Sequence, residues 1–451
     1  MDSIWDRIRR LFSEPTKSEA GVSPDQNLND KEAPLSIAII GSGIGGLSLA
    51  IGLLKHNVPF TLYESAAAFS AIGAGVGLGP NALRAMDMIE PRLRKLYDGI
   101  STGNTSPEKI NDMFDGMMAE PGLGENSGWH GAPVTSPHFT RTSAHRMGLL
   151  DIMKSLIPAE MVKFSKRVVD VEQKGEKVFV TFADGETIQV DTVIGCDGIK
   201  GRTRKAVLGS RYPDEVHAKY SGVYVYRCLL PMEEAQKLLG PLAGDAKMFM
   251  DNGRNLAMYP VEQLKTVNVV WFILDKGTWN SEENTEEVSR EYMLSDVEGS
   301  DPRLIKFLDF AKPLKWALFH HKYTSTYYSS QICLLGDNAH ATTPHQAAGA
   351  GQAIEDALLL SSILPLVKKS SQLPKAFQIY EDIRRPRAQK VVDTSEETGR
   401  IYMFQDPTIG SDMQKLMVTA NERLPWIWLH DLEKDVRTAK ERFLAEANSS
   451  N

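Results

Sequence analysis

The fold is decided by the stretch Leu35 to Glu64, LSIAIIGSGIGGLSLAIGLLKHNVPFTLYE. Its apolar, β-branched segment 36–40 has the composition of a buried parallel strand. The Ala- and Leu-rich segment 47–55 predicts a helix, and segment 60–63 predicts a second strand. The turn between the first strand and the helix satisfies the pattern G-x-G-x-x-G, at Gly41, Gly43 and Gly46.

Each glycine of this motif meets a different steric need. Gly41 permits a tight turn, Gly43 lets a pyrophosphate approach the backbone, and Gly46 lets the helix pack against the strand. The N–H groups at the start of the helix then face the phosphates. Glu64 ends the second strand, where an acidic side chain can accept hydrogen bonds from ribose hydroxyls. Because strand, helix, strand and terminal acid all frame the motif, it predicts a dinucleotide site rather than an ordinary glycine-rich turn.

Composition excludes several other classes of protein. The 451 residues can fill two to three domains, and the formal charge of −7 gives no overall attraction to nucleic acid or anionic lipid. No apolar run approaches the roughly 20 residues of a membrane span, and no secretory signal is expected. The three cysteines lack ligand spacing, which argues against a disulfide framework and a metal site and favours a cytoplasmic location: Cys196, Cys228 and Cys333.

The first 34 residues are expected to form a short helix and a flexible tether. Apolar residues recur at helical spacing from Ile4 to Phe12, and segment 13–33 is rich in Ser, Pro, Asp, Asn and Lys. The helix could dock on the body of the protein, on a partner subunit in a homodimer, or on a membrane surface as a short anchor. The sequence leaves these alternatives open.

The rest of the chain predicts two groups of strands that are followed by helices. A second glycine-rich run spans 72–79 and leads into a helix over 81–89, whereas 100–140 is interpreted as an irregular excursion. A helix is expected over 147–156, and a meander of strands over 167–173, 177–182 and 187–194. A second sheet is expected from 220–230, 248–250, 255–261 and 267–274, interrupted by helices over 233–239 and 285–295. A strand over 331–335 then precedes helices over 350–368 and 373–401, with a kink at Pro386.

Two further acid–glycine turns complete a family pattern. They are Cys196-Asp197-Gly198 and Gly336-Asp337-Asn338-Ala339-His340, the latter followed by Pro344 and by the sequence HQAAGAGQ. With the first motif, these turns stand in the order that is typical of the class A flavoprotein monooxygenases, which the chain resembles from about 35 to 390. This is the family of para-hydroxybenzoate and salicylate hydroxylases. The second turn departs from the pattern, because Gly201 stands where many members carry serine.

The resemblance implies an α/β fold: a Rossmann-like FAD-binding domain with an inserted mixed β-sheet domain that binds the substrate, and C-terminal helices. The expected boundaries are 35–215 with 325–400 for the FAD-binding domain, 216–324 for the substrate-binding domain and 401–451 for the C-terminal helices. It also implies non-covalent FAD and NAD(P)H as a transient reductant. Glu64 would bind the adenosine ribose, and the rest of the flavin would be lined by Gly77, Arg146, Asp337, Gly349 and Ala350. For Arg146, a surface cation that caps a helix is the alternative.

Arg227 is the first candidate for the active site. It shares one strand face with Val223, Val225 and Leu229, and an arginine on an apolar face is costly unless something negative meets it. The partner is either an Asp or Glu of this chain or an anionic substrate. Tyr259, on a neighbouring strand, is the second candidate, although a bare aromatic residue is more often part of a core. Both resemble the substrate-binding Arg and Tyr of a fungal subgroup that hydroxylates phenols, in some members with loss of aromaticity.

The resemblance therefore implies hydroxylation of a salicylate-like or polyketide-derived phenol with O2, through a hydroperoxyflavin. Arg227 would stabilise the phenolate and Tyr259 would orient it. A flavin-dependent epoxidase and a non-catalytic binder similar to the guanine-nucleotide dissociation inhibitors are the rival hypotheses. His340 is expected to be structural, His345 could face the substrate, and the cluster Glu381, Arg384, Arg385 and Arg387 is expected to be solvated or ion-paired.

Overall fold

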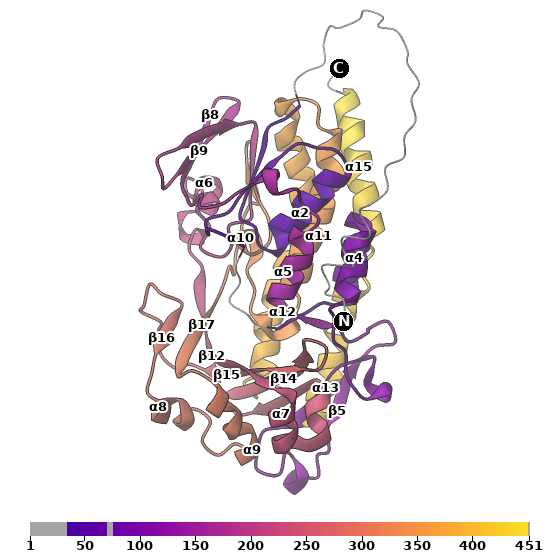
Figure 1. The fold of residues 1–451 in the computed structure, drawn as a ribbon, viewed down its shortest axis with the longest axis vertical. Helices are drawn as coiled ribbons and strands as arrows, with labels where there is room; N and C mark the ends of the chain where they lie inside the picture. The colour runs from indigo at the N-terminus through magenta and orange to yellow at the C-terminus, as the bar shows by residue number, and fades with distance from the viewer. Residues whose placement is uncertain (1–33, 70–74, 450–451) are drawn as a thin grey trace, which may run out of the picture. The chain divides into compact units, whose positions relative to one another are not determined.

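The predicted first strand, β1 (Ile37–Ile40), lies inside a six-stranded sheet of the computed structural model, which describes residues 34–69 and 75–449 (Figure 1). The order of this sheet is β18-β19-β11-β1-β2-β7, and all its pairs are parallel except β18 with β19. The other strands are β2 (Thr61–Tyr63), β7 (Val162–Lys163), β11 (Thr192–Gly195), β18 (Tyr328–Ser329) and β19 (Ile332–Leu334). The expected N-terminal helix and tether lie outside the described residues.

The turn after β1 has the close packing that the glycine motif predicts. Gly41 has φ +100°, and a Cβ there would lie 2.4 Å from the carbonyl oxygen of Cys196. Gly46 lies in helix α2 (Ile44–Lys55), and a Cβ there would lie 2.0 Å from the carbonyl oxygen of Gly41. Gly43 differs, because a Cβ there would meet no atom within 4 Å. Two glycines thus serve the packing of the chain, and the third leaves open space beside the backbone.

Helices pack together on the six-stranded sheet. α11 (Gly349–Ile363) packs against α2, α3 (Pro80–Ile89) and α15 (Leu432–Ser449). Figure 1 shows α2, α11 and α15 side by side. Pro80 is the first residue of its helix, a position that its fixed φ and missing N–H favour. α4 (Pro91–Asp98) and α5 (Arg146–Lys154) extend this layer. α12 (Leu373–Tyr402) is a continuous helix of 30 residues with Pro386 inside it.

The meander was predicted with one error. β8 (Val168–Lys174), β9 (Lys177–Phe182) and β10 (Thr187–Val190) form an antiparallel sheet of their own, in the order β10-β9-β8. The predicted strand 187–194 is wrong as a single strand, because β11 begins at Thr192 and joins the six-stranded sheet beside β1. Asp191 separates the two strands, and its carboxylate accepts hydrogen bonds from the Ser36 N–H and hydroxyl.

A second, eight-stranded sheet has the order β16-β17-β12-β15-β14-β13-β4-β5. Its predicted strands are β12 (Lys219–Pro231), β13 (Lys247–Asp251), β14 (Arg254–Val261) and β15 (Thr266–Leu274). The interpretation of 100–140 as irregular is wrong, because β4 (Asp112–Met118) pairs with β13 and β5 (Ala132–Thr135) forms the edge. The helix expected over 285–295 is also wrong in part, since β16 (Thr285–Glu287) precedes α8 (Arg290–Ser295). β17 (Leu314–His320) is a further strand that was not predicted.

The two faces of this sheet differ in what covers them. On β12, Tyr224, Tyr226, Cys228 and Leu230 enter a core with α7 (Met232–Leu239) and with the segment that follows α8, including α9 (Pro302–Ile305). The alternate residues face the other way, toward the six-stranded sheet and its helices, which together form the nucleotide-binding layer. α13 (Met413–Glu422) packs on β5, and α14 (Pro425–Trp428) contacts α3, so the C-terminal helices touch both layers.

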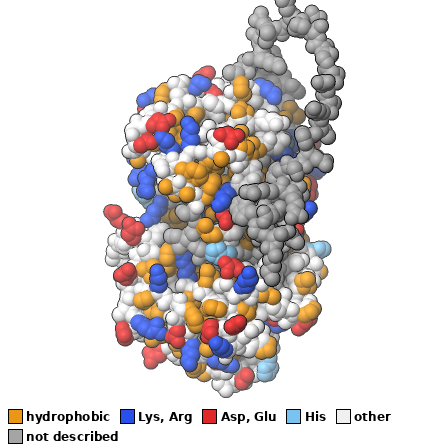
Figure 2. All heavy atoms as spheres, viewed as in Figure 1, with side chains coloured by type: hydrophobic (Ala, Val, Ile, Leu, Met, Phe, Trp, Pro, Cys, Tyr) orange, Lys and Arg blue, Asp and Glu red, His pale blue; other side chains and the backbone are white. Residues whose placement is uncertain are grey.

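The surface and the helices give two further observations. On the face shown in Figure 2, basic and acidic side chains are interspersed over the surface. Among the described residues, we find no helix with the length and apolarity needed to cross a membrane.

A buried ion network joins α11 to α12. Glu355 accepts hydrogen bonds from Arg384 and Arg387, at 2.6 and 2.8 Å, and Asp356 accepts one from Arg384 at 2.8 Å. Of the charge cluster expected to be solvated or ion-paired, Arg384 and Arg387 are buried and ion-paired. Burial acts to raise the pKa of Glu355, but Arg384 and Arg387 outweigh it and lower this pKa from 4.5 to about 2.

We expect Glu355→Gln to destabilise the protein by about 3–5 kcal/mol at pH 7, because it leaves buried guanidinium charge uncompensated. Since the pKa of Glu355 is lowered in the folded state, its stabilisation is complete above pH 4.5 and is lost as the pH falls toward 2. Melting temperatures measured across this range should therefore converge for wild type and variant at low pH.

The matched control is Glu234→Gln, which breaks an exposed pair with Lys237. This change should alter stability by less than about 1 kcal/mol. Equal effects of the two substitutions would contradict the assignment of Glu355 to the buried network.

Candidate active site

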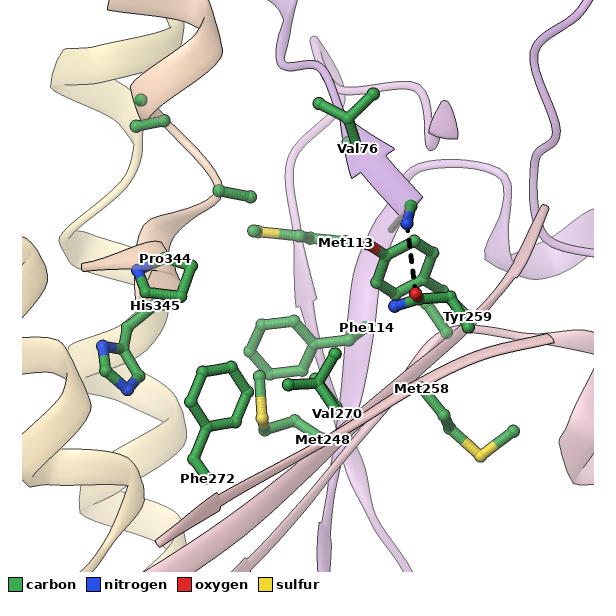
Figure 3. Close-up of a pocket in the computed structure, with 18 of the residues that line it drawn as sticks. Val76, Met113, Phe114, Met248, Met258, Tyr259, Val270, Phe272, Pro344 and His345 are labelled. Atoms are coloured by element: carbon green, nitrogen blue, oxygen red, sulfur yellow. Dashed lines mark hydrogen bonds between the residues drawn. The ribbon is translucent and has the colours of Figure 1, made fainter. Parts of the chain in front are cut away.

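A cavity of about 420 Å³ lies between the eight-stranded sheet and the nucleotide-binding layer. Figure 3 shows its apolar middle, where Met113, Phe114, Met248, Val270 and Phe272 gather, while Met258 points to the opposite side of its strand. Pro344 and His345 close it from the loop before α11, and Val76 of β3 (Gly75–Gly77) from above in this view. The cavity is therefore a largely apolar chamber with polar groups at its margins.

Strand register explains which side chains meet in the cavity. Arg227 pairs with Val270, which pairs with Ala257, which pairs with Met248. These four residues form one row across β12, β15, β14 and β13 on the same face. In the next row Tyr259 pairs with Asn268. Arg227 and Tyr259 thus line one cavity, on strands that β15 separates.

Arg227 is half-buried, and its guanidinium lies 3.6 Å from the centre of the Trp316 ring. Within the described residues it has no ion pair with a carboxylate. Burial, together with the charge of nearby Arg146, lowers the pKa of Arg227. The alternative of a buried ion pair is therefore not observed in the described part of the chain, and the guanidinium keeps free donors at the cavity.

Tyr259 stands where the glycine-rich run meets the sheet. A Cβ on Gly75 would lie 2.7 Å from the Tyr259 hydroxyl oxygen, so only glycine leaves room for the phenol. The Gly75 N–H donates to Asn268 Oδ1 at 3.1 Å and fixes β3 against β15. Burial raises the pKa of Tyr259 to about 12, against the opposing charge of Arg141. The phenol is thus neutral and can donate a hydrogen bond.

The nucleotide-binding layer contributes the remaining predicted residues of the cavity. Arg146 begins α5, and Asp337, exposed at the end of β19, begins α10 (Asp337–His340). Gly349 and Ala350 form the first turn of α11, whose N–H groups have no acceptor within the helix. All four line the cavity, as does Gly77. Anionic and carbonyl oxygens of a ligand would be stabilised at this helix end.

The three motif glycines lie at the β1–α2 turn, and Glu64 follows β2 beside that turn; none of the four lines the cavity. Glu64 accepts hydrogen bonds from the Ser42 N–H at 3.0 Å and the Ala66 N–H at 2.8 Å, and also from the Ser42 hydroxyl. Burial acts to raise its pKa, but these hydrogen bonds outweigh burial and lower it. A dinucleotide requires a carboxylate for its adenosine ribose, and open space and helix N–H groups for its pyrophosphate. The carboxylate of Glu64, the open space at Gly43 and the start of α2 have these properties.

The second and third turns are bonded directly to each other. Asn338 donates to the Asp197 carboxylate at 2.7 Å and to the Gly195 carbonyl at 3.2 Å. A Cβ on Gly201 would lie 2.6 Å from both Asp197 Oδ1 and Asn338 Oδ1. Glycine at position 201, where many members of the family carry serine, therefore fits the close packing of these polar groups.

The two histidines behave differently. His340 is buried, does not line the cavity, and its Nε2 lies 2.6 Å from Asp356 Oδ2. His345 is buried and lines the cavity, its ring centre 5.0 Å from that of Phe272. Burial lowers the pKa of His345 to about 4, so its ring is neutral near pH 7.

Sequence reasoning missed several residues that line the cavity. Met113 and Phe114 come from the unpredicted strand β4, whose apolar run DMFDGMM was the available signal. Arg141 is a buried guanidinium beside Tyr259, and Lys247 is a buried ammonium held by Asp115 at 2.5 Å. Neither basic residue stands in a pattern that distinguishes it from a surface cation.

Comparisons with known proteins agree with this architecture. Residues 35–395 match the family model described as FAD binding domain. The chain is 41% identical to an FAD-dependent monooxygenase of Gibberella moniliformis, covering 90% of this chain and 96% of that protein. It is 38% identical to a 6-methylsalicylate 1-monooxygenase of Aspergillus terreus, covering 92% and 94%.

Among solved structures, a salicylate hydroxylase in a substrate complex superposes with a TM-score of 0.79 at 30% identity. The match covers 90% of this chain and 98% of that one. The nucleotide fold, the cavity between two sheets and these relatives agree. This chain therefore belongs to the FAD-dependent monooxygenases of the salicylate hydroxylase type.

Proposed function

We propose that the protein hydroxylates an electron-rich phenolic substrate, salicylate-like or polyketide-derived, with O2 and NAD(P)H. The observation that supports this most is the guanidinium of Arg227, which reaches an apolar cavity without a carboxylate partner among the described residues. A phenol attacks an electrophilic oxygen far better as its phenolate, and a cation in a water-poor site lowers the pKa of the phenol. An epoxidase of a neutral alkene would not need this charge.

The residues of the chain act by binding and orientation. Arg227 pairs with the phenolate oxygen, and the neutral Tyr259 hydroxyl donates a hydrogen bond that selects which ring carbon receives the oxygen atom. Phe114, Val270 and Phe272 form apolar walls that exclude water from the reacting atoms. FAD, when bound and reduced, supplies the oxygen activation.

The proposed FAD site follows the groups described above. Gly41, Gly43 and Gly46 with the start of α2 would hold the pyrophosphate, and Glu64 the adenosine ribose. Asp337 would accept from ribityl hydroxyls, and Arg146, Gly77 and the first turn of α11 at Gly349 and Ala350 would surround the flavin ring.

We also propose the functional division of the chain. Segments 35–215 and 325–400 would form the FAD-binding domain, 216–324 the substrate-binding domain and 401–451 the C-terminal helices. β4 and β5 come from the first segment but join the eight-stranded sheet of the substrate-binding domain. A cytoplasmic location is proposed because the three cysteines are free.

The function is tested by a substrate screen on the purified protein. We expect the protein to be yellow, to oxidise NADH or NADPH faster when a suitable phenol is added, and to add one oxygen atom to that phenol. Salicylates, resorcylic aldehydes and simple phenols are the compounds to compare, with mass detection of the product. A flavin-loaded protein that oxidises none of them, but oxygenates an alkene, would contradict the proposal.

Arg227→Ala should keep FAD bound and lose product formation by roughly 10²-fold near neutral pH, because the phenolate loses a charge-assisted partner. Without the cation, ionisation of the phenol moves back toward its ordinary pKa of about 10, so the remaining activity should rise with pH more steeply than that of the wild type. Tyr259→Phe should cost less, about tenfold at most, because only one neutral hydrogen bond is lost. Initial rates and flavin absorbance from pH 6 to 9 measure these effects.

The control for Arg227 is Arg254→Ala, an arginine of the same sheet that pairs with Asp251 at 2.9 Å and does not line the cavity. It should retain wild-type turnover. Unchanged turnover in Arg227→Ala would remove Arg227 from the site, and a flavin-free Tyr259→Phe protein would make Tyr259 a structural residue.

Substitutions at two of the three motif glycines, Gly43 and Gly46, should separate an effect on cofactor binding from an effect on folding. The Gly43→Val apoprotein should melt at nearly the same temperature as the wild-type apoprotein. It should bind FAD weakly, because the valine side chain fills space that the structure leaves open. Gly46→Ala should instead lower the melting temperature, because its Cβ would clash with the Gly41 carbonyl. Flavin content per chain and apoprotein melting curves measure both effects; full FAD occupancy in Gly43→Val would contradict the placement of the pyrophosphate.

A further inference from the structure

A second pocket, of about 240 Å³, adjoins the cavity on the side of Arg227. We call it the outer pocket. Arg227 of β12 and Asn268 of β15 line both the cavity and the outer pocket. Asn268 is only 2% exposed, and its Oδ1 accepts from the Gly75 N–H, so its side chain has a fixed position. Two side chains therefore form the boundary between the two spaces.

Strand register shows that the outer pocket continues the cavity along the same face of the sheet. Leu229 pairs with Asn268, which pairs with Tyr259, so these three residues form the row next to that of Arg227. Between Leu229 and Arg227 on β12 stands Cys228, whose side chain enters the core on the opposite face. Because side chains alternate along a strand, Leu229 points to the cavity face. The outer pocket therefore lies beside the cavity and not behind the sheet.

The walls of the outer pocket are apolar, and its mouth is open to solvent. Leu229 of β12 and Leu314 and Trp316 of β17 form the walls. Phe310, in the segment before β17, is 41% exposed, and Lys312 is also exposed. A ligand group in the outer pocket would thus exchange water for apolar contacts along its length and would reach solvent at its end.

The position of Arg227 connects the outer pocket to the proposed reaction. Its guanidinium lies 3.6 Å from the centre of the Trp316 ring, at the boundary of the two spaces. A phenolate that pairs with Arg227 is therefore held where the cavity meets the outer pocket. A chain on the phenol ring can then extend past Arg227 and Asn268 while the ring itself stays in the cavity.

We propose that the outer pocket binds an apolar side chain on the ring of the phenolic substrate. The substrate class is then narrowed to phenols that carry a chain of several carbons, and Leu229 and Leu314 are specificity-determining residues that contact this chain. This inference rests on the proposed hydroxylase function. Burial of apolar surface supplies the affinity for the chain, and each fully buried methylene strengthens binding by about fourfold.

The test compares phenols that differ only in chain length on the FAD-loaded enzyme. The pairs are 5-methylresorcinol with 5-pentylresorcinol and 4-methylphenol with 4-pentylphenol, each titrated by the change in flavin absorbance. The wild type should bind the pentyl member of at least one pair roughly 10- to 10²-fold more tightly, because four more methylenes are largely buried. Leu314→Trp and Leu229→Trp, which fill the outer pocket, should each remove most of this preference and change the affinity for the methyl compounds by less than about threefold.

The control is Leu444→Trp on α15, where the leucine is 49% exposed and lines neither space. It should leave the ratio of pentyl to methyl affinity unchanged. A pentyl preference that survives both tryptophan variants would place the chain elsewhere and overturn the proposal. Slower association of both members of a pair, with unchanged affinities, would make the outer pocket only an access path and would also overturn it. If the tryptophan variants do not fold, Leu314→Ala decides, because it should weaken binding of the pentyl compound alone, by up to about tenfold.

The outcomes separate this inference from the proposed function. An enzyme that oxygenates short phenols but shows no chain preference overturns the role of the outer pocket and leaves the hydroxylase intact. An enzyme that shows the chain preference but oxygenates none of the phenols confirms the binding site and overturns the hydroxylase.

Discussion

The contacts among three turns are the constraint on which the rest of the structure depends. These are the G-x-G-x-x-G turn after β1 and the two acid–glycine turns after β11 and β19. Gly41 can approach Cys196 only without a Cβ, and Asn338 bonds to Asp197, so the first, second and third turns are fixed against one another at the ends of adjacent parallel strands. The large sheet is built from segments that leave and re-enter this framework between those turns. The position of the cavity relative to Asp337 therefore follows from backbone packing that tolerates almost no change.

The sequence was most informative where structure is local. The β1–α2–β2 unit, the meander and strands β12 to β15 follow from short-range periodicity and glycine chemistry, and their bounds agree with prediction within a few residues. β4 and β5 were missed because β4 pairs with β13, which is more than a hundred residues away, and because the connection between β4 and β5 carries no hairpin signal. The break at Asp191 was missed for a related reason: the alternating residues of β10 run directly into the apolar β11, and only tertiary pairing separates the two strands.

The candidate site was predicted in part for the same physical reasons. Arg227 is detectable in sequence because strand alternation places a charge among apolar residues. Arg141 lies in a segment without regular alternation, and its burial results from the packing of β4 and Tyr259 around it, which no local pattern encodes. Residues within local motifs can therefore be predicted from the sequence, whereas residues that only tertiary packing brings together cannot.

Two kinds of buried charge occur in this molecule, and the difference between them distinguishes structural from functional residues. Arg384 and Arg387 are saturated by Glu355, Asp356 and backbone carbonyls, which gives α11 and α12 a fixed relative position. Arg141 and Arg227, in contrast, face the cavity with donors that the described residues do not fill. A protein can keep such charges in an apolar chamber only at a loss of stability. That loss is understandable if the missing negative charge arrives with the substrate, because the same unpaired donors then supply both its affinity and the stabilisation of its ionised form.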